Sequence, residues 1–126
     1  MTQEKGRKKA GIRGEDLAAE YLRTCGYTIL ERNWRSGHLE IDIVGSAPDG
    51  LHFVEVKTLV APFFISPEEK VGTAKQKKIT EAAIRYVKEH GGVGAQELFF
   101  DVISVTFDGG TAQVKFFPKA WVPIYV

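Results

Sequence analysis

The chain has one cysteine, Cys25, among its 126 residues, which excludes an intrachain disulfide and a cysteine-based zinc cage. Its helical spacing from Leu22 predicts a small core residue rather than a nucleophile. Long apolar runs are also absent, and none approaches the roughly 20 residues that a membrane-spanning helix needs. The basic N-terminus has no apolar stretch after it and so lacks the pattern of a secretory signal. We therefore expect a cytoplasmic protein with no membrane partner.

Net charge of either sign is nearly absent as well, at +1, so the total does not indicate a nucleic-acid-binding protein. The basic residues are nevertheless clustered, and such clusters can neutralise phosphate groups. On charge alone, an ordinary solvated surface is the simpler explanation. The clusters comprise Lys5, Arg7, Lys8, Lys9 and Arg13, then Arg32 and Arg35 around Trp34, then Lys70, Lys75, Lys77 and Lys78.

The length and an apolar fraction of 44% predict one domain at residues 11–126, preceded by a basic, partly disordered segment at residues 1–10. Apolar periodicity and turn residues predict an α/β fold with the element order αβββαβ and one added strand. The first three strands form an antiparallel meander, and a helix covers each side of a mixed central sheet. The predicted helices are residues 11–25 and 67–89, and the predicted strands are residues 27–34, 39–45, 51–58, 98–107 and 111–117.

Four charged residues interrupt the apolar pattern of two predicted strands. Central strands rarely carry charges, because burying an unpaired charge is costly. Side chains alternate along a strand, so Glu40 and Asp42 should share one face of theirs, and Glu55 and Lys57 one face of the next. The tight turn at residues 48–50 pairs the two strands and should bring Asp42 near Glu55.

Two neighbouring carboxylates repel each other unless a cation neutralises them. Magnesium is held in proteins by one or two carboxylates with water and phosphate oxygens, so Asp42 and Glu55 suit Mg²⁺. The carbonyl of Val56, between the two functional side chains, is a further candidate ligand. The alternative is a pair of salt bridges, in which Glu55 pairs with Lys57 or with a lysine of the second helix.

Polar residues also lie on the core-facing stripes of both predicted helices. Glu15 precedes Ala18 by three residues, and Lys75 and Gln76 precede Ile79 by four and three. One polar cluster at the sheet would give these side chains partners. The alternatives are a helix-dipole contact for Glu15 and a solvent-facing first turn for Lys75 and Gln76.

Asp101 lies in an apolar strand, where it either buttresses the site or caps a neighbouring backbone group. The histidines, His38, His52 and His90, have spacings that suit no metal motif, and we assign them no role at the site.

Six short segments, in this order and spacing, resemble one family. They are GEDLA at 14–18, GYTIL at 26–30, NWR at 33–35, EID at 40–42, FVEVK at 53–57 and FDVI at 100–103. The chain from about residue 11 to residue 105 resembles the YraN-like family of the PD-(D/E)XK nuclease superfamily. That superfamily includes archaeal Holliday junction resolvases and restriction endonucleases.

The resemblance implies a restriction-endonuclease-like core in which Asp42 is the metal aspartate and Glu55 and Lys57 are the second acid and the lysine. Glu15 matches the glutamate of the first helix, and Gln76 matches a polar residue that some members carry on the second helix. There are two departures. Gly37 is separated from Glu40 by two residues, and Leu59 stands where relatives tend to carry an arginine.

We therefore expect a Mg²⁺- or Mn²⁺-dependent endonuclease that hydrolyses phosphodiesters of branched or structured DNA, as a possible homodimer. The phosphate backbone would be held by Arg32, Arg35, Lys75, Lys77 and Lys78. One alternative is a DNA-binding module without catalysis, which the departure at Leu59 favours. Another is a protein-interaction domain that uses Phe63, Phe64 and the C-terminal residues WVPIYV.

Overall fold

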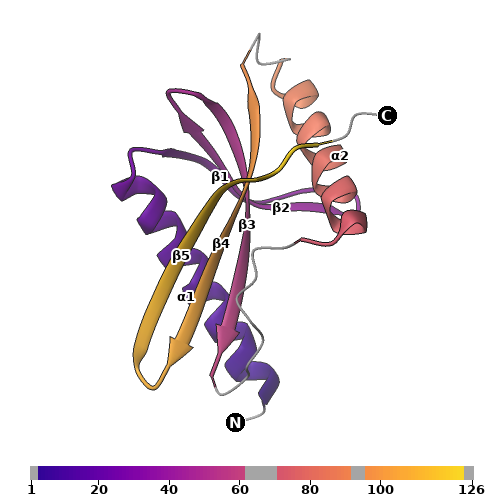
Figure 1. Cartoon of the computed structure of the whole chain (residues 1–126). Helices are drawn as coiled ribbons and strands as arrows, with labels where there is room; N and C mark the ends of the chain where they lie inside the picture. The colour runs from indigo at the N-terminus through magenta and orange to yellow at the C-terminus, as the bar shows by residue number, and fades with distance from the viewer. Residues whose placement is uncertain (1–2, 62–70, 92–95, 124–126) are drawn as a thin grey trace.

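The computed structural model describes residues 3–61, 71–91 and 96–123, with the backbone alone for residues 3–8 (Figure 1). Five strands form one sheet in the order β1-β2-β3-β4-β5, in which β3 and β4 are parallel and the other neighbours antiparallel. The predicted α/β fold with a mixed sheet, and the predicted order αβββαβ with an added strand, are confirmed. The elements are α1 (Gln3–Thr24), β1 (Thr28–Ser36), β2 (Leu39–Ala47), β3 (Gly50–Val60), α2 (Thr73–Glu89), β4 (Leu98–Asp108) and β5 (Thr111–Trp121).

Helix α1 begins at Gln3 rather than near residue 11, so the segment that we expected to be partly disordered is helical from Gln3 onward. The segment lacks an apolar stripe but is rich in residues with high helix propensity, such as Lys, Arg, Glu and Gln. Cys25 lies after the helix end and is exposed, so its predicted place in the core is wrong.

The C-terminus of α1 has the hydrogen bonds of a Schellman motif. The amide of Tyr27 donates to the carbonyl of Leu22, and the amide of Gly26 donates to that of Arg23, both at 3.0 Å. Gly26 has φ of 91°, a left-handed conformation that glycine adopts without strain. The motif turns the chain directly into β1 and leaves Cys25 on the outside of the bend.

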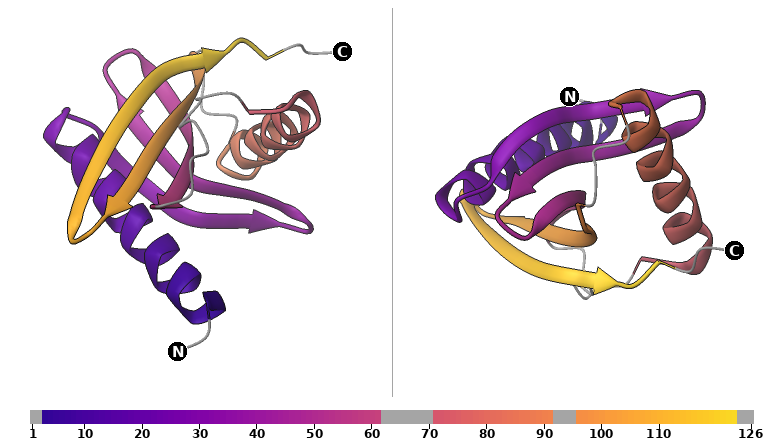
Figure 2. Two further views of the ribbon diagram at one scale, coloured as in Figure 1. Left: turned by 60° about the horizontal axis from the view of Figure 1, so that its bottom comes forward. Right: turned by 90° about the horizontal axis from the view of Figure 1, so that it is seen from above.

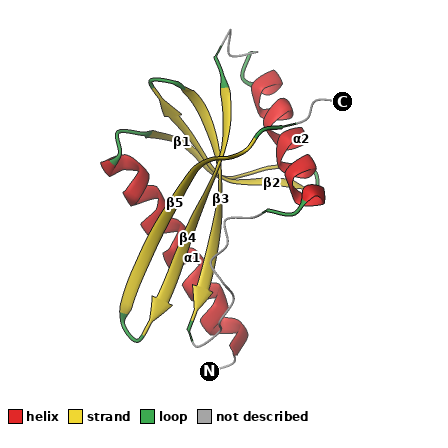
Figure 3. Ribbon diagram, viewed as in Figure 1, coloured by secondary structure: helices red, strands yellow, loops and turns green. Residues whose placement is uncertain are grey.

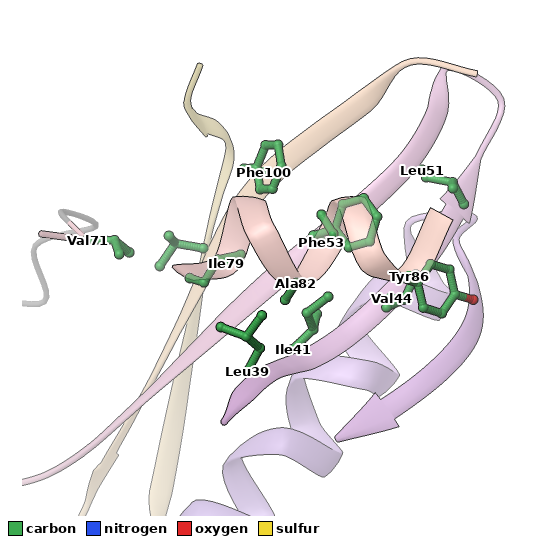
Figure 4. Close-up of a cluster of buried hydrophobic side chains, with 12 residues drawn as sticks. Leu39, Ile41, Val44, Leu51, Phe53, Val71, Ile79, Ala82, Tyr86 and Phe100 are labelled. Atoms are coloured by element: carbon green, nitrogen blue, oxygen red, sulfur yellow. The ribbon is translucent and has the colours of Figure 1, made fainter. Parts of the chain in front are cut away.

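The two helices lie on opposite faces of the sheet (Figures 1 and 2). Each face has a hydrophobic cluster that includes residues of one helix. The α1-side cluster consists of Ala18, Ala19, Leu22, Ile43, Val54, Ile103 and Val105. The α2-side cluster, shown in part in Figure 4, consists of Leu39, Ile41, Val44, Leu51, Phe53, Val71, Ile79, Ala82, Ala83, Tyr86, Phe100 and Val102.

Helix α2 begins at Thr73, whereas the start predicted at residue 67 lies outside the described residues. Lys70, Phe63 and Phe64 also lie outside them, as does the end of the C-terminal segment. Neither described helix combines the length and the apolar character required to cross a lipid bilayer.

A buried histidine connects three parts of the sheet on the α1 side. His52 of β3 is 1% exposed, and its Nδ1 lies 2.6 Å from Oδ2 of Asp101 on β4. Its Nε2 lies 2.7 Å from Oδ1 of Asp49, in the turn between β2 and β3. Both ring nitrogens face carboxylate oxygens, and the ring donates to both only when it carries both protons, as an imidazolium. Burial lowers the pKa of His52, but its bonds to the two carboxylates outweigh burial and raise the pKa above the ordinary value.

Asp101 is fully buried and uses its second oxygen to hold β5. Its Oδ1 accepts a hydrogen bond from the backbone amide of Lys119 at 2.7 Å. There the pairing between β4 and β5 shifts, and Lys119 has φ of 52°. The expectation that Asp101 caps a backbone group is confirmed. The histidine between the acids was missed, because only its spacing against metal motifs had been considered.

We expect His52→Asn to lower the free energy of unfolding by about 3 kcal/mol, because it leaves the buried carboxylate of Asp101 without its charged partner. His38→Asn is the matched control, because His38 is exposed, and it should change stability by less than about 0.5 kcal/mol. Urea unfolding near pH 6 measures both. Equal losses in the two variants would contradict the assigned role of His52.

Candidate functional site

The sheet forks at Asp42. Strand β2 pairs with β3 over residues 43–47 and 50–54 only, whereas residues 39–41 pair with β1 alone. Strand β3 pairs with the parallel strand β4 over residues 51–60. Beyond Asp42, therefore, the sheet divides into two arms. One arm contains β1 and β2, and the other contains β3, β4 and β5. In Figure 3 β2 runs toward α2 while β3 continues beside β4.

The side chain of Asp42 occupies the opening of the fork. If the pairing continued, Val56 would lie opposite Ile41, but this pair is absent. The amide of Val56 instead donates to Oδ2 of Asp42 at 2.8 Å. A carboxylate thus replaces the missing backbone acceptor, which an inward-facing amide requires.

Strand β1 is irregular at the same level. Its pairing with β2 passes from Arg32↔Ile43 to Trp34↔Ile41 and omits Asn33 and Asp42, and Asn33 has φ of 53°. Asparagine tolerates this left-handed conformation better than most residues. Ile41 belongs to the α2-side cluster and Ile43 to the α1-side cluster, although they are two residues apart.

Strict alternation in β2 therefore fails at Asp42. The prediction that Glu40 and Asp42 share one face of a regular strand does not hold, because Asp42 points along the sheet toward β3. Asp42 and Glu55 are close because the side chain of Asp42 lies in the fork beside β3, and not because the two strands continue to pair there.

Glu55 is the second acid of the fork. Its side chain is 9% exposed, and its Oε1 lies 2.5 Å from Nζ of Lys75 on α2. The alternative that the sequence left open, an ion pair of Glu55 with a lysine of the second helix, is therefore present. The ammonium provides the charge compensation that a buried carboxylate requires.

Glu55 lies close enough to Asp42 to affect its ionisation. The pKa of Asp42 is raised to about 7. Burial is the largest cause, the negative charge of Glu55 is the next, and the hydrogen bond from Val56 acts in the opposite direction. The charges of Glu15 and Glu40 are smaller causes of the same upward shift. Four acids therefore surround the fork, which makes a second negative charge there unfavourable.

Glu15 reaches the fork from α1. Its Oε1 is buried and has no hydrogen-bond partner among the described residues. Burial raises the pKa of Glu15, and the nearby charge of Arg32 opposes this shift. The neighbouring Gly14 lets α1 lie directly against β3, because a Cβ at this position would clash with the hydroxyl of Thr58.

Lys57 is partly buried on β3, two residues after Glu55, and lies beside Ser104 of β4 in the strand register. The hydroxyl of Ser104 is buried and has no hydrogen-bond partner within residues 3–61, 71–91 and 96–123. Gln76 has a local role: its side-chain amide donates to the carbonyl of Val71 at 2.7 Å. The structure thus does not bring Gln76 into the polar cluster that the sequence predicted.

The predicted phosphate-binding residues have different surroundings. Lys77 and Lys78 are exposed on α2. Arg32 pairs with Asp16 of α1 at 2.8 Å, and Arg35 lies 3.6 Å from Glu40. Acids therefore partly neutralise both arginines.

Lys75 is held at the fork by more than one acid. Burial would lower its pKa, but the bond to Glu55 and the charges of Glu55, Asp42 and Glu40 raise it above the ordinary value. We therefore expect Lys75 to stay charged throughout the neutral pH range.

The donors at the fork match a hard divalent cation better than zinc. Within the described part of the chain, no three acidic, histidine or cysteine side chains are arranged to hold a metal ion together. Magnesium does not require such a cage, because it keeps several waters and binds through one or two carboxylates. Asp42 and Glu55 meet that requirement, and the unpartnered oxygen of Glu15 can accept a hydrogen bond from a bound water.

Comparison with known proteins gives the family. The model of the uncharacterised protein family UPF0102 matches residues 14–105, which include the whole fork. The chain belongs to the UPF0102 family. This agrees with the YraN-like resemblance at the level of the family, whereas membership of the nuclease superfamily stays a prediction.

Relatives match over most of their length. A UPF0102 protein of Anaeromyxobacter dehalogenans is 40% identical over 116 residues, which cover 92% of this chain and 86% of the relative. One of Syntrophomonas wolfei is 41% identical over 108 residues, or 86% of this chain and 93% of the relative. A UPF0102 protein of Geobacter metallireducens is 40% identical over 114 residues, which cover 90% of this chain and 93% of the relative.

In this UPF0102 protein we expect Gly14→Ala to lower the free energy of unfolding by about 1–3 kcal/mol, because the new methyl group forces α1 away from Thr58. Gly11→Ala is the matched control on the same helix, where a Cβ has nothing within 4 Å. It should raise stability by up to about 1 kcal/mol. Urea unfolding compares the two variants, and a neutral Gly14→Ala would show that the close approach does not matter.

The stability of the protein should depend on pH through Asp42. The pKa of Asp42 is higher in the folded protein than in the unfolded chain, so the folded state binds the proton more tightly. The contribution of Asp42 to stability is therefore greatest below about pH 4 and falls as the pH rises to about 7.

Asp42→Asn keeps an acceptor for Val56 and removes the charge. Without divalent metal, it should be roughly 2–4 kcal/mol more stable than the wild type at pH 8 and nearly equal to it at pH 4. Asp108→Asn, in the exposed β4–β5 turn, should show a constant difference across the same range. A pH-independent difference for Asp42→Asn would contradict the raised pKa.

Proposed function

We propose that this UPF0102 protein is a metal-dependent nuclease that hydrolyses phosphodiesters of branched or structured DNA. The observation that carries the proposal is the fork, where the carboxylates of Asp42 and Glu55 lie in a polar opening of the sheet and the charge of Glu55 helps to raise the pKa of Asp42. A charged pair in such a position suggests a function rather than a contribution to stability.

Asp42, Glu55 and the carbonyl of Val56 would hold Mg²⁺ or Mn²⁺. When bound, such a cation supplies Lewis-acid polarisation of a phosphate and activation of water. Asp42 is already held in position, because its Oδ2 accepts a hydrogen bond from the amide of Val56. Its Oδ1 is not used by that bond and would be the oxygen that faces the cation. Glu55 would change partner, since Lys75 contacts it in this structure.

Lys57 and Glu15 would act on the reacting groups from opposite sides. The ammonium of Lys57 follows Glu55 on the same strand and would stabilise the negative charge that develops on the phosphate. The unpartnered Oε1 of Glu15 would orient a water by accepting its proton in a hydrogen bond.

The exposed lysines of α2, Lys77 and Lys78, would contact the phosphate backbone. Lys78 lies one turn after Lys75 and flanks the core-facing stripe, whereas Lys77 points outward. Phosphate contacts position a nucleic acid but carry no sequence information, so the proposal is recognition of shape.

A second candidate is a DNA-binding module without catalysis. The observation that favours it is the Lys75–Glu55 ion pair, which already satisfies one proposed metal ligand. In that case the fork would be a structural polar cluster, and α2 would provide the binding surface.

The decisive experiment uses labelled linear, flap and four-way DNA with Mg²⁺ or Mn²⁺. We expect cleavage of branched substrates, and a loss of at least about 100-fold in Asp42→Asn and Lys57→Met, since each removes a group that acts on the transition state. Asp108→Asn is the control, because Asp108 is exposed at the end of β4 and has no proposed role at the fork.

Cleavage that both fork variants retain would rule out this site. DNA binding that weakens with added salt, without cleavage of any substrate, would instead support the second candidate.

A further inference from the structure

Lys75 reaches the fork from a different element than the acids it faces. Its side chain is 58% exposed, whereas that of Glu55 is 9% exposed, and the two meet at 2.5 Å. The ammonium therefore reaches the fork from the first turn of α2, at the end of a flexible and half-exposed stem. Glu55, by contrast, is buried on the central strand β3.

The position of this ammonium resembles that of a bound cation. It contacts one proposed metal ligand, Glu55, and is close enough to the other, Asp42, for the charges to interact. A single positive charge balances one of these two carboxylates, whereas a divalent cation balances both. A metal that binds Oε1 of Glu55 must take the place of the lysine, since both require the same oxygen.

We infer that Lys75 is the resident counter-ion of the fork, which a divalent cation displaces from Glu55 and which then binds a phosphate group of the substrate. The inference rests on the proposed function and adds a regulatory step to it. In the metal-free protein the lysine neutralises Glu55 and lowers the affinity for metal. Once displaced, it places a positive charge beside the site, so that bound metal and bound phosphate favour each other.

A purely structural ion pair is the opposing explanation. It would stabilise the contact between α2 and β3, and its loss would weaken the fold without strengthening metal binding. Metal affinity measured in the absence of DNA separates the two explanations, because only a competing counter-ion makes the affinity rise when the lysine is removed.

The test is calorimetric titration of the metal-free protein with Mn²⁺, without DNA. We expect Lys75→Met, which keeps the stem and removes the charge, to bind Mn²⁺ about tenfold more tightly than the wild type. Lys75→Arg keeps the charge and should retain the affinity of the wild type to within about threefold. Lys78→Met is the matched control for a general loss of positive charge, because Lys78 is exposed one turn further along α2.

A second measurement examines the transfer to phosphate. With Ca²⁺ in place of Mn²⁺, to prevent cleavage, Lys75→Met should bind four-way DNA several-fold more weakly than the wild type. Circular dichroism and thermal unfolding in chelator verify that each variant is folded, and Lys75→Gln, which also removes the charge, serves where Lys75→Met does not fold.

The outcomes separate this inference from the proposed function. Tighter Mn²⁺ binding by Lys75→Met than by Lys78→Met supports the inference, and so does binding by Lys75→Met where the wild type shows none. Wild-type Mn²⁺ binding that Lys75→Met leaves unchanged or weakens overturns the inference and leaves the proposed metal site intact. No Mn²⁺ binding by any variant at millimolar concentrations overturns both.

Discussion

The hydrogen bond from the amide of Val56 to Asp42 is the contact on which the rest of the site depends. A sheet can fork only if the amides that lose a partner strand find other acceptors. Asp42 provides one from its side chain and so holds the two arms apart at a fixed point. The same carboxylate places a negative charge beside Glu55. One side chain thus meets a structural requirement and creates the electrostatic condition for a cation site.

The two clusters of buried charge differ in how completely their charges are compensated. Around His52, the ring lies between two carboxylates, and both oxygens of Asp101 have partners, which indicates a structural cluster. At the fork, one oxygen of Glu15 has no hydrogen-bond partner in the part of the chain that the structure describes, and burial and neighbouring acids make ionisation of Asp42 unfavourable. Incomplete compensation of this kind is typical of sites that bind something further.

Predictions from local pattern succeeded where burial was regular. The strands are apolar runs bounded by turn residues and α2 has a clear helical repeat, so their order and type followed from the local pattern. The start of α1 could not be predicted from apolar periodicity, because residues 3–10 form helix by propensity and have no apolar stripe. Cys25 was placed in the core by extending the helical repeat past Thr24, where the turn at Gly26 ends it.

The sequence alone determined the order of the elements and the strand positions of Asp42, Glu55 and Lys57, because charges stand out in apolar strands. Tertiary structure decided which groups those charges meet. The fork, the Lys75–Glu55 pair and the position of His52 between two acids join residues that are distant in the chain. Local periodicity reports the face on which a side chain lies, but its partner depends on how separate elements pack.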